Sequence, residues 1–229
     1  MITTEAILLR RREMRETSLL VVAYTPDCGK VHGLVKGVRG ARAAVPWYLE
    51  PMTRQAIVLY ERRRSNLGLI SSFDLIDPFD GIRRDFVRLS YGTFCLELVD
   101  QMTEIGDPHP EIYRLLLSVL RSLAEGADPA AVARFLEVHL LQIQGVLPDP
   151  GALRLSPGGR LSLERMLTMR WEELRRLALS PPVAAELRLK LQGLLDGVLE
   201  RELRSRRFLL QTGCERGIDR PALPARSAA

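Results

Sequence analysis

The hydrophobic pattern of this chain changes its period near residue 80. Before that point, short apolar runs rich in β-branched residues alternate with polar turns, as expected of strands. The five runs cover residues 3–10, 18–25, 31–35, 55–60 and 67–72. From Asp80 onward, apolar residues recur at helical spacing, for example at Ile112, Leu115, Leu116, Val119, Leu120 and Leu123. The pattern predicts an α+β protein, with a β domain at residues 1–79 and an all-α helical domain at residues 80–229.

Five short strands in residues 1–72, with no helical period between most of them, favour a small closed barrel. A five-stranded barrel of this size is typical of the OB-fold, whose exposed face and connecting loops commonly bind oligonucleotides. An SH3-like barrel would give almost the same pattern. The sequence pattern alone leaves both barrels open.

The helical domain is expected to form an antiparallel bundle, because its helix-to-helix connections are short. Asp107-Pro108 and Asp128-Pro129 fit helix starts, with aspartate near the N-cap and proline in the first turn. Proline and glycine at residues 146–162 predict an irregular link. The remaining expectations are helices at residues 163–178 and 183–208 and a disordered tail at residues 211–229.

The sequence holds no convincing catalytic or metal-binding constellation. His32, His109 and His139 are isolated, with no HxxxH or HExxH pair. His139 lies on an apolar helical stripe, which favours a hydrogen-bonded core residue over a ligand. The three cysteines are far apart and form neither a disulfide framework nor a CxxC pair. We therefore expect a protein that is not an enzyme, with no catalytic residues, no cofactor, no bound metal and no small-molecule substrate.

Positive charge is concentrated toward the two ends of the chain. The net charge is +5, but residues 1–72 carry +6, residues 73–199 carry −4 and residues 200–229 carry +3. Asymmetry of this kind favours an anionic partner. The C-terminal charges, Arg201, Arg204, Arg206 and Arg207, fit either complementarity to a helix dipole or a second DNA contact.

The strongest binding candidate is the stretch Gly29–Arg42, GKVHGLVKGVRGAR. After a predicted strand, a cation recurs every third residue, with glycines between the cations. Such a loop suits a phosphate backbone better than a small-molecule pocket, although a solvated basic loop would have the same composition. Because aromatic residues are few in this domain, phosphate contacts are expected to dominate over base stacking. The predicted DNA-binding residues are Arg10, Arg12, Lys30, Lys36, Arg39, Arg42, Arg62 and Arg63.

Several segments between Glu5 and Asp100 carry a family resemblance. They are EAILLRRR, ETSLLVVAYTPDCGKVHGLVKGVRGAR, YLEPMT and FDLIDPFDGIRRDFVRLSYGTFCLELVD. In this order and spacing the chain resembles RecO, a family of bacterial DNA repair and recombination mediators. The later helices and the closing ELRSRRFL fit the family more loosely.

The resemblance implies an N-terminal OB-fold, a helical domain and a role without bond-making chemistry. RecO proteins bind single- and double-stranded DNA and anneal complementary strands. With RecR, and by contacting the C-terminal tail of the single-strand-binding protein SSB, they help to load RecA onto SSB-coated DNA. The family's basic strand-loop positions fall on Lys36 and Arg39, with Arg42 close by, and SSB contact belongs to the helical domain.

The chain departs from the family at one segment and shows no sign of a membrane partner. Many members carry a four-cysteine zinc module after the helix that here ends near Gly145, but VLPDPGALRLSPGGRLSL contains no cysteine. A structural zinc site needs four ligands, so no zinc is predicted.

No signal sequence or long apolar run is present, so a cytoplasmic protein, nucleoid-associated when on DNA, is expected. A second hypothesis is an adaptor that binds SSB or RecR through the helical domain, with incidental DNA binding.

Overall fold

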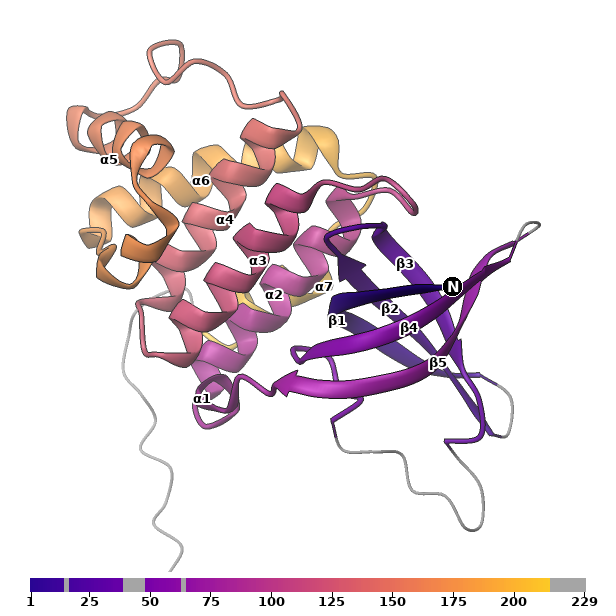
Figure 1. The fold of residues 1–229 in the computed structure, drawn as a ribbon. Coiled ribbons are helices and arrows are strands. Elements are labelled where there is room, and N and C mark those ends of the chain that lie inside the picture. Colours follow the sequence, from indigo (N-terminus) through magenta and orange to yellow (C-terminus); the bar gives the residue numbers. More distant parts are fainter. Residues whose placement is uncertain (15–16, 39–47, 63–64, 215–229) are drawn as a thin grey trace, which may run out of the picture.

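The N-terminal part of the chain is a closed β-barrel that lies against a layer of helices (Figure 1). The structure is a computed structural model that describes residues 1–14, 17–38, 48–62 and 65–214, without the side chains of residues 61, 62 and 65. The strands are β1 (Ile2–Met14), β2 (Ser18–Thr25), β3 (Gly29–Val35), β4 (Arg54–Arg62) and β5 (Ser65–Asp77).

The strand order distinguishes the two barrels that the sequence left open. The order is β1-β2-β3-β5-β4, and β4 pairs back onto β1 to close the barrel. Strands β3 and β5 run parallel, from His32 opposite Leu67 to Leu34 opposite Leu69, whereas the other pairs are antiparallel. This is the five-stranded Greek-key order of the OB-fold, so that prediction is confirmed.

Strand β1 is longer than its apolar run predicts, and this changes where its arginines lie. The run predicts a strand ending at Arg10, but β1 continues to Met14 and pairs with β2 along this half. The ladder hydrogen bonds extend the strand through Arg12, whose side chain is solvated on the outer face. A register shift between Leu8 and Arg10 marks a bulge, which adds one residue to the strand. As a result Leu9 packs toward the helices next to Arg10.

Two apolar clusters hold the barrel and the helices together. The barrel interior contains Ala6, Leu8, Val21, Ala23, Val31, Val35, Ile57, Leu59 and Ile70. Alternate residues of the same strands, including Ile7, Val22 and Tyr24, point outward and pack with Phe94 and Leu98 of the helical layer. Strand β2 is therefore buried at every position, because apolar neighbours cover both of its faces.

The helical layer begins directly after the barrel. Its elements are α1 (Asp80–Arg83), α2 (Phe86–Met102), α3 (Pro110–Ala124), α4 (Pro129–Ile143), α5 (Pro157–Thr168), a 3₁₀ turn η1 (Trp171–Arg176), α6 (Pro181–Val198) and α7 (Arg204–Gln211). The predicted start at Asp128 is confirmed, since its side chain accepts from the amide of Ala130 at 3.1 Å. The predicted start at Asp107 is wrong, because α3 begins at Pro110 after His109. None of the described helices is long and apolar enough to cross a membrane.

The segment after α4 is more helical than predicted. Helix α5 begins at Pro157, inside the expected link at 146–162, and Ser156 caps it by accepting from the amide of Gly159. The helix expected at residues 163–178 is divided between α5 and η1. Residues 215–229 of the expected tail lie outside the described residues.

The helix expected at residues 183–208 is broken into α6 and α7. Gly197 lies one residue before the end of α6 and lowers helix propensity there, but residues 199–203 between the two helices contain no glycine or proline. Leu203 is fully buried at the break, and Glu97 of α2 accepts from the backbone amide of Ser205 at 2.8 Å in the first turn of α7. These tertiary contacts outweigh helix propensity and fix the second helix across α2.

His139 on α4 is a buried, hydrogen-bonded core residue, as its place on an apolar stripe predicts. Its Nε2 donates to the carbonyl oxygen of Met166 at 3.0 Å. Burial lowers the pKa of His139 below the usual 6.5, against the opposing effect of that hydrogen bond. Since the unfolded chain binds the proton more readily, the free energy of unfolding falls as pH drops below the unfolded pKa and continues to fall toward the folded pKa.

Replacing His139 with glutamine should therefore weaken the acid sensitivity of the fold. Glutamine keeps a side-chain N–H donor but does not titrate. Each such histidine contributes at most about 1.4 kcal/mol per pH unit in this range. Melting temperatures at neutral pH and near pH 5 check the prediction, and the decrease between the two pH values should be smaller in the variant. Part of the decrease should remain, because burial also lowers the pKa of His32. Equal decreases in both proteins would contradict it.

Candidate nucleic-acid interface

The outer face of β1, β2 and β3 presents a row of positively charged side chains. Arg10 lies opposite Val22, which lies opposite His32, so these residues share one face of the sheet. Arg12 is two residues further along β1 and lies on the same face. Lys36 follows β3 directly, and all three cations are exposed. We call Arg10, Arg12 and Lys36 the β1–β3 cation row.

Among the other predicted DNA-binding residues, the structure describes the side chain of Lys30, which is mostly covered. The side chain of Lys30 is only 11% exposed, and its Nζ lies 2.5 Å from the backbone oxygen of Asp100. Helix α2 covers this ammonium, so the β1–β3 cation row does not include Lys30, whose contact with DNA stays a prediction. Arg39, Arg42, Arg63 and the side chain of Arg62 lie outside the described part of the chain, so these stay predictions.

Asp100 on α2 joins the cation row to the helical layer. Its carboxylate lies 2.7 Å from Arg10 Nε and 3.5 Å from Lys30 Nζ. The Asp100 side chain is 5% exposed, whereas that of Arg10 is 52% exposed. Burial, together with Arg10 and Lys30, holds the pKa of His32 below its usual value, so the row gains no charge from His32 at neutral pH. No local pattern in the sequence indicates this contact, because Asp100 is 70 residues from Lys30.

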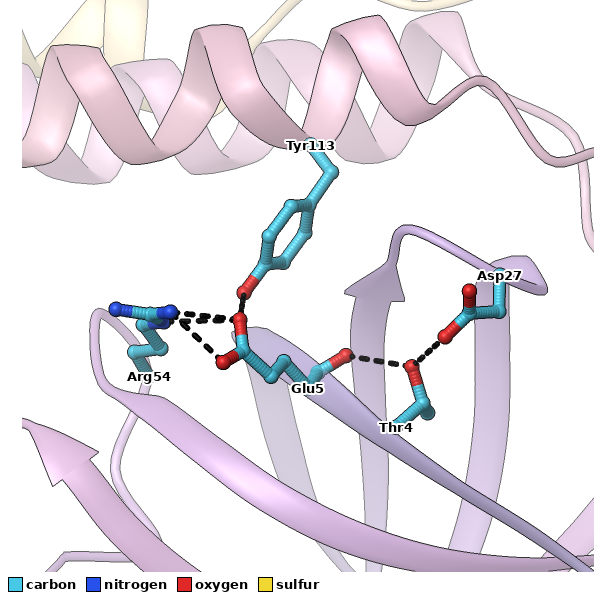
Figure 2. Close-up of polar contacts among 5 residues, drawn as sticks. All are labelled: Thr4, Glu5, Asp27, Arg54 and Tyr113. Atoms are coloured by element: carbon cyan, nitrogen blue, oxygen red, sulfur yellow. Dashed lines mark hydrogen bonds and ion pairs between the residues drawn. The ribbon is translucent and has the colours of Figure 1, made fainter.

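A second polar contact between the barrel and the helices is formed by Glu5, Arg54 and Tyr113 (Figure 2). Arg54 Nη2 on β4 lies 2.8 and 2.7 Å from the two carboxylate oxygens of Glu5. The Tyr113 hydroxyl on α3 donates to Glu5 Oε2 at 2.9 Å. Hydrogen bonds from Arg54, opposed by burial and assisted by Tyr113, hold the pKa of Glu5 below its usual range. Beside them Thr4 donates its hydroxyl to Asp27 in the turn after β2, so this corner links β1, β4 and the β2–β3 turn next to α3.

Replacing Tyr113 with phenylalanine should lower the free energy of unfolding by about 1–2 kcal/mol. The change removes one hydrogen bond to a charged carboxylate, while Arg54 still holds Glu5. Urea denaturation followed by circular dichroism measures the loss. The matched control is Tyr60→Phe, since Tyr60 is 42% exposed and its change should stay within about 0.5 kcal/mol. Equal effects at the two tyrosines would show that the Glu5 contact does not stabilise the fold.

A cleft of about 1320 Å³ lies between the barrel and the C-terminal helices. Arg10 and His32 line its barrel side, α2 forms its floor, and residues 198–208 line the opposite side. Phe86 and Phe208 are 56% and 44% exposed in this lining, with ring centroids 5.9 Å apart in an edge-on arrangement. Exposed aromatic side chains of this kind are typical of protein contact surfaces.

Three of the C-terminal arginines, Arg204, Arg206 and Arg207, lie at the start of α7 and not at the end of a long helix, whereas Arg201 lies between α6 and α7. Cations oppose the dipole at a helix N-terminus, so the explanation by dipole complementarity is wrong for these three arginines. Glu97 offsets them, because its carboxylate accepts from the amides of Arg204 and Ser205 at 3.1 and 2.8 Å. Arg206 pairs with Asp196 and Arg207 with Glu202, whereas Arg201 and Arg204 are exposed and line the cleft.

The residues that replace the family's zinc module do not fit a zinc ion. Between α4 and α5 the acidic side chain is Asp149, whose Oδ1 accepts from the amide of Gly151 at 2.7 Å in a turn. This stretch has no cysteine or histidine to complete a tetrahedral ligand set. Among the described residues, no group of three or more histidine, cysteine or carboxylate side chains is arranged to hold a metal ion.

Fold and site together define an OB-fold barrel joined to a helical bundle, with its exposed cations on the barrel face. Family models agree with both parts: Recombination protein O N terminal matches residues 1–79, and Recombination protein O C terminal matches residues 83–150. The chain belongs to the RecO family of DNA repair proteins.

Individual relatives extend the same similarity. The DNA repair protein RecO of Moorella thermoacetica is 26% identical over 95% of this chain and 93% of its own length. Those of Geobacter sulfurreducens and Geobacter metallireducens are 33% and 36% identical over 63% and 62% of this chain. These two matches span 58% and 57% of the relatives' own lengths.

Proposed function

We propose that this chain binds single- and double-stranded DNA, anneals complementary strands and, with RecR, helps to load RecA onto SSB-coated DNA. The observation that carries the proposal is the β1–β3 cation row, which lies exposed on the outer face of an OB-fold. This class of barrel commonly binds oligonucleotides on a sheet face and its adjoining loops. Membership in a DNA repair family supports the same conclusion.

We assign the DNA contact to residues 1–79 and the contacts with RecR and the SSB tail to the helical domain from residue 80 onward. The proposed activity is binding and not catalysis, and it takes place in the cytoplasm on nucleoid DNA. Arginine and lysine side chains neutralise phosphates and leave base edges free. A strand held in this way remains available for pairing, which is the property that annealing needs.

The proposal is tested by fluorescence anisotropy of a labelled oligonucleotide over a series of salt concentrations. Contacts from Arg12 and Lys36, the two cations of the row without an ion pair to a described residue, predict that log K falls with log salt with a slope of about −1.4 or steeper for a single strand. Adding the complementary labelled strand to the same mixture then measures annealing. Weak binding at every salt concentration would overturn the DNA-binding proposal.

The cleft favours a second candidate function, an adaptor that binds SSB or RecR with only incidental DNA affinity. Its exposed Phe86 and Phe208, with Arg201 and Arg204 nearby, provide apolar and cationic groups for an acidic peptide. A labelled peptide of the SSB tail and purified RecR are the probes. Tight peptide or RecR binding together with DNA affinity no greater than that of an unrelated basic protein would establish the adaptor function.

A further inference from the structure

Asp100 introduces a negative charge at the end of the β1–β3 cation row. It belongs to α2, yet its carboxylate contacts Arg10, a member of the row, at 2.7 Å. The Arg10 side chain remains 52% exposed, so part of its guanidinium still faces solvent. By contrast, Arg12 and Lys36 are exposed with no ion pair among the described residues. The row therefore contains two available cations and one that is shared with a carboxylate.

A phosphate and the Asp100 carboxylate compete for the same guanidinium. Both are anionic oxygen groups that arginine binds by charge-assisted hydrogen bonds. The Asp100 carboxylate is already in place beside Arg10, since α2 holds it against the barrel with 5% of its side chain exposed, whereas a phosphate must arrive from solution. Its backbone oxygen also accepts from Lys30 Nζ at 2.5 Å, which fixes that turn of α2 in place.

We infer that Asp100 is a positioning residue that limits the DNA affinity of the row by withholding Arg10 from phosphate. The inference rests on the proposed DNA-binding function. If so, the number of phosphates that the row neutralises depends on the helical layer, because the Asp100 side chain of α2 holds Arg10. Asparagine at this position preserves the volume and an acceptor for Lys30 but removes the charge that competes with phosphate.

The Asp100→Asn variant should bind a single-stranded oligonucleotide about two- to fivefold more tightly than the native chain at 0.1 M salt, with a salt slope steeper by up to about 0.7. The matched control is Glu104→Gln, which removes the same charge from an exposed position shortly after α2 without a contact to Arg10. In the Arg10→Gln background the gain from Asp100→Asn should disappear. Equal gains from Asp100→Asn and Glu104→Gln, or a gain that survives without Arg10, would overturn the inference.

A second comparison leaves Asp100 intact and so does not depend on the folding of the variant. Arg10→Gln should weaken binding by about twofold and Arg12→Gln by about fivefold, because only Arg10 is already shared with a carboxylate. Equal losses would overturn the inference while the DNA-binding proposal still stands. If the native chain shows no salt-dependent binding at all, it is the proposed function that fails.

Discussion

Reversing the charge of Arg12 and Lys36 together, to glutamate, should weaken single-stranded DNA binding by about 25- to 100-fold at 0.1 M salt. Each lost phosphate contact costs about fivefold at this salt concentration, and the new carboxylates repel the remaining phosphates. The salt slope should become shallower by about 1.4. Both side chains are exposed, so the fold should be retained. Anisotropy titrations over the same salt series measure the affinity and the slope.

The control reverses the same number of charges elsewhere on the molecule. Arg160 and Arg165 are exposed on α5, which lies on the side of the helical layer away from the barrel (Figure 1). Their double replacement by glutamate should change DNA affinity far less than the change at Arg12 and Lys36. Equal losses in the two double variants would show that net charge, and not the β1–β3 cation row, governs DNA binding.

Replacing Gly29 with alanine should lower the free energy of unfolding by about 2–5 kcal/mol. Gly29 has a φ of +63°, in the left-handed region, and an added Cβ would lie 2.1 Å from the backbone oxygen of Asp107. Asp107 belongs to the segment between α2 and α3, so the clash forces the barrel and the helices apart or distorts the turn. Urea denaturation measures the loss, and the midpoint should fall without a change in the helical content of the folded state.

Gly37 provides the matched control, because it separates backbone strain from the clash. Its φ is +70°, but an added Cβ there would meet no atom within 4 Å. Gly37→Ala should therefore cost about 1–2 kcal/mol, the strain of the left-handed conformation alone. Equal losses in the free energy of unfolding for Gly29→Ala and Gly37→Ala would contradict the prediction. They would show that the close approach of the β2–β3 turn to Asp107 adds nothing to the cost of backbone strain.

The sequence predicted the order of strands and helices because the spacing of apolar residues along the chain differs between the two kinds of element. Alternating runs before residue 72 and helical stripes after Asp80 correspond to the barrel and the helices of the structure. Features that depend on distant residues were not predicted. The extension of β1 to Met14 needs the pairing with β2, and the break between α6 and α7 needs Leu203 and Glu97.

For the candidate site, the sequence likewise predicted the exposed cations but not the side chains that pair with distant residues. Exposed Arg12 and Lys36 follow from charge and strand position alone. Lys30 has the same sequence character but lies against Asp100, 70 residues away, and Glu5 bonds Tyr113, 108 residues away. Neither partner has a local signal, because an isolated acid or tyrosine on a helix usually faces solvent. Side-chain pairing across such separations is a property of the packed molecule.

The closure of the barrel also has a consequence for the order in which the chain folds. Barrel closure pairs Ile2 with Leu59, and the last strand ends at Asp77, so every strand of the barrel precedes α2 and α3 in the chain. Since domains fold as units during synthesis from the N-terminus, the growing chain can complete its β-barrel first. Contacts through Asp100 and Tyr113 then form on a preassembled surface. Ribosome-bound intermediates should accordingly carry the cation row, with Arg10 still unpaired, before the helical layer covers its edge.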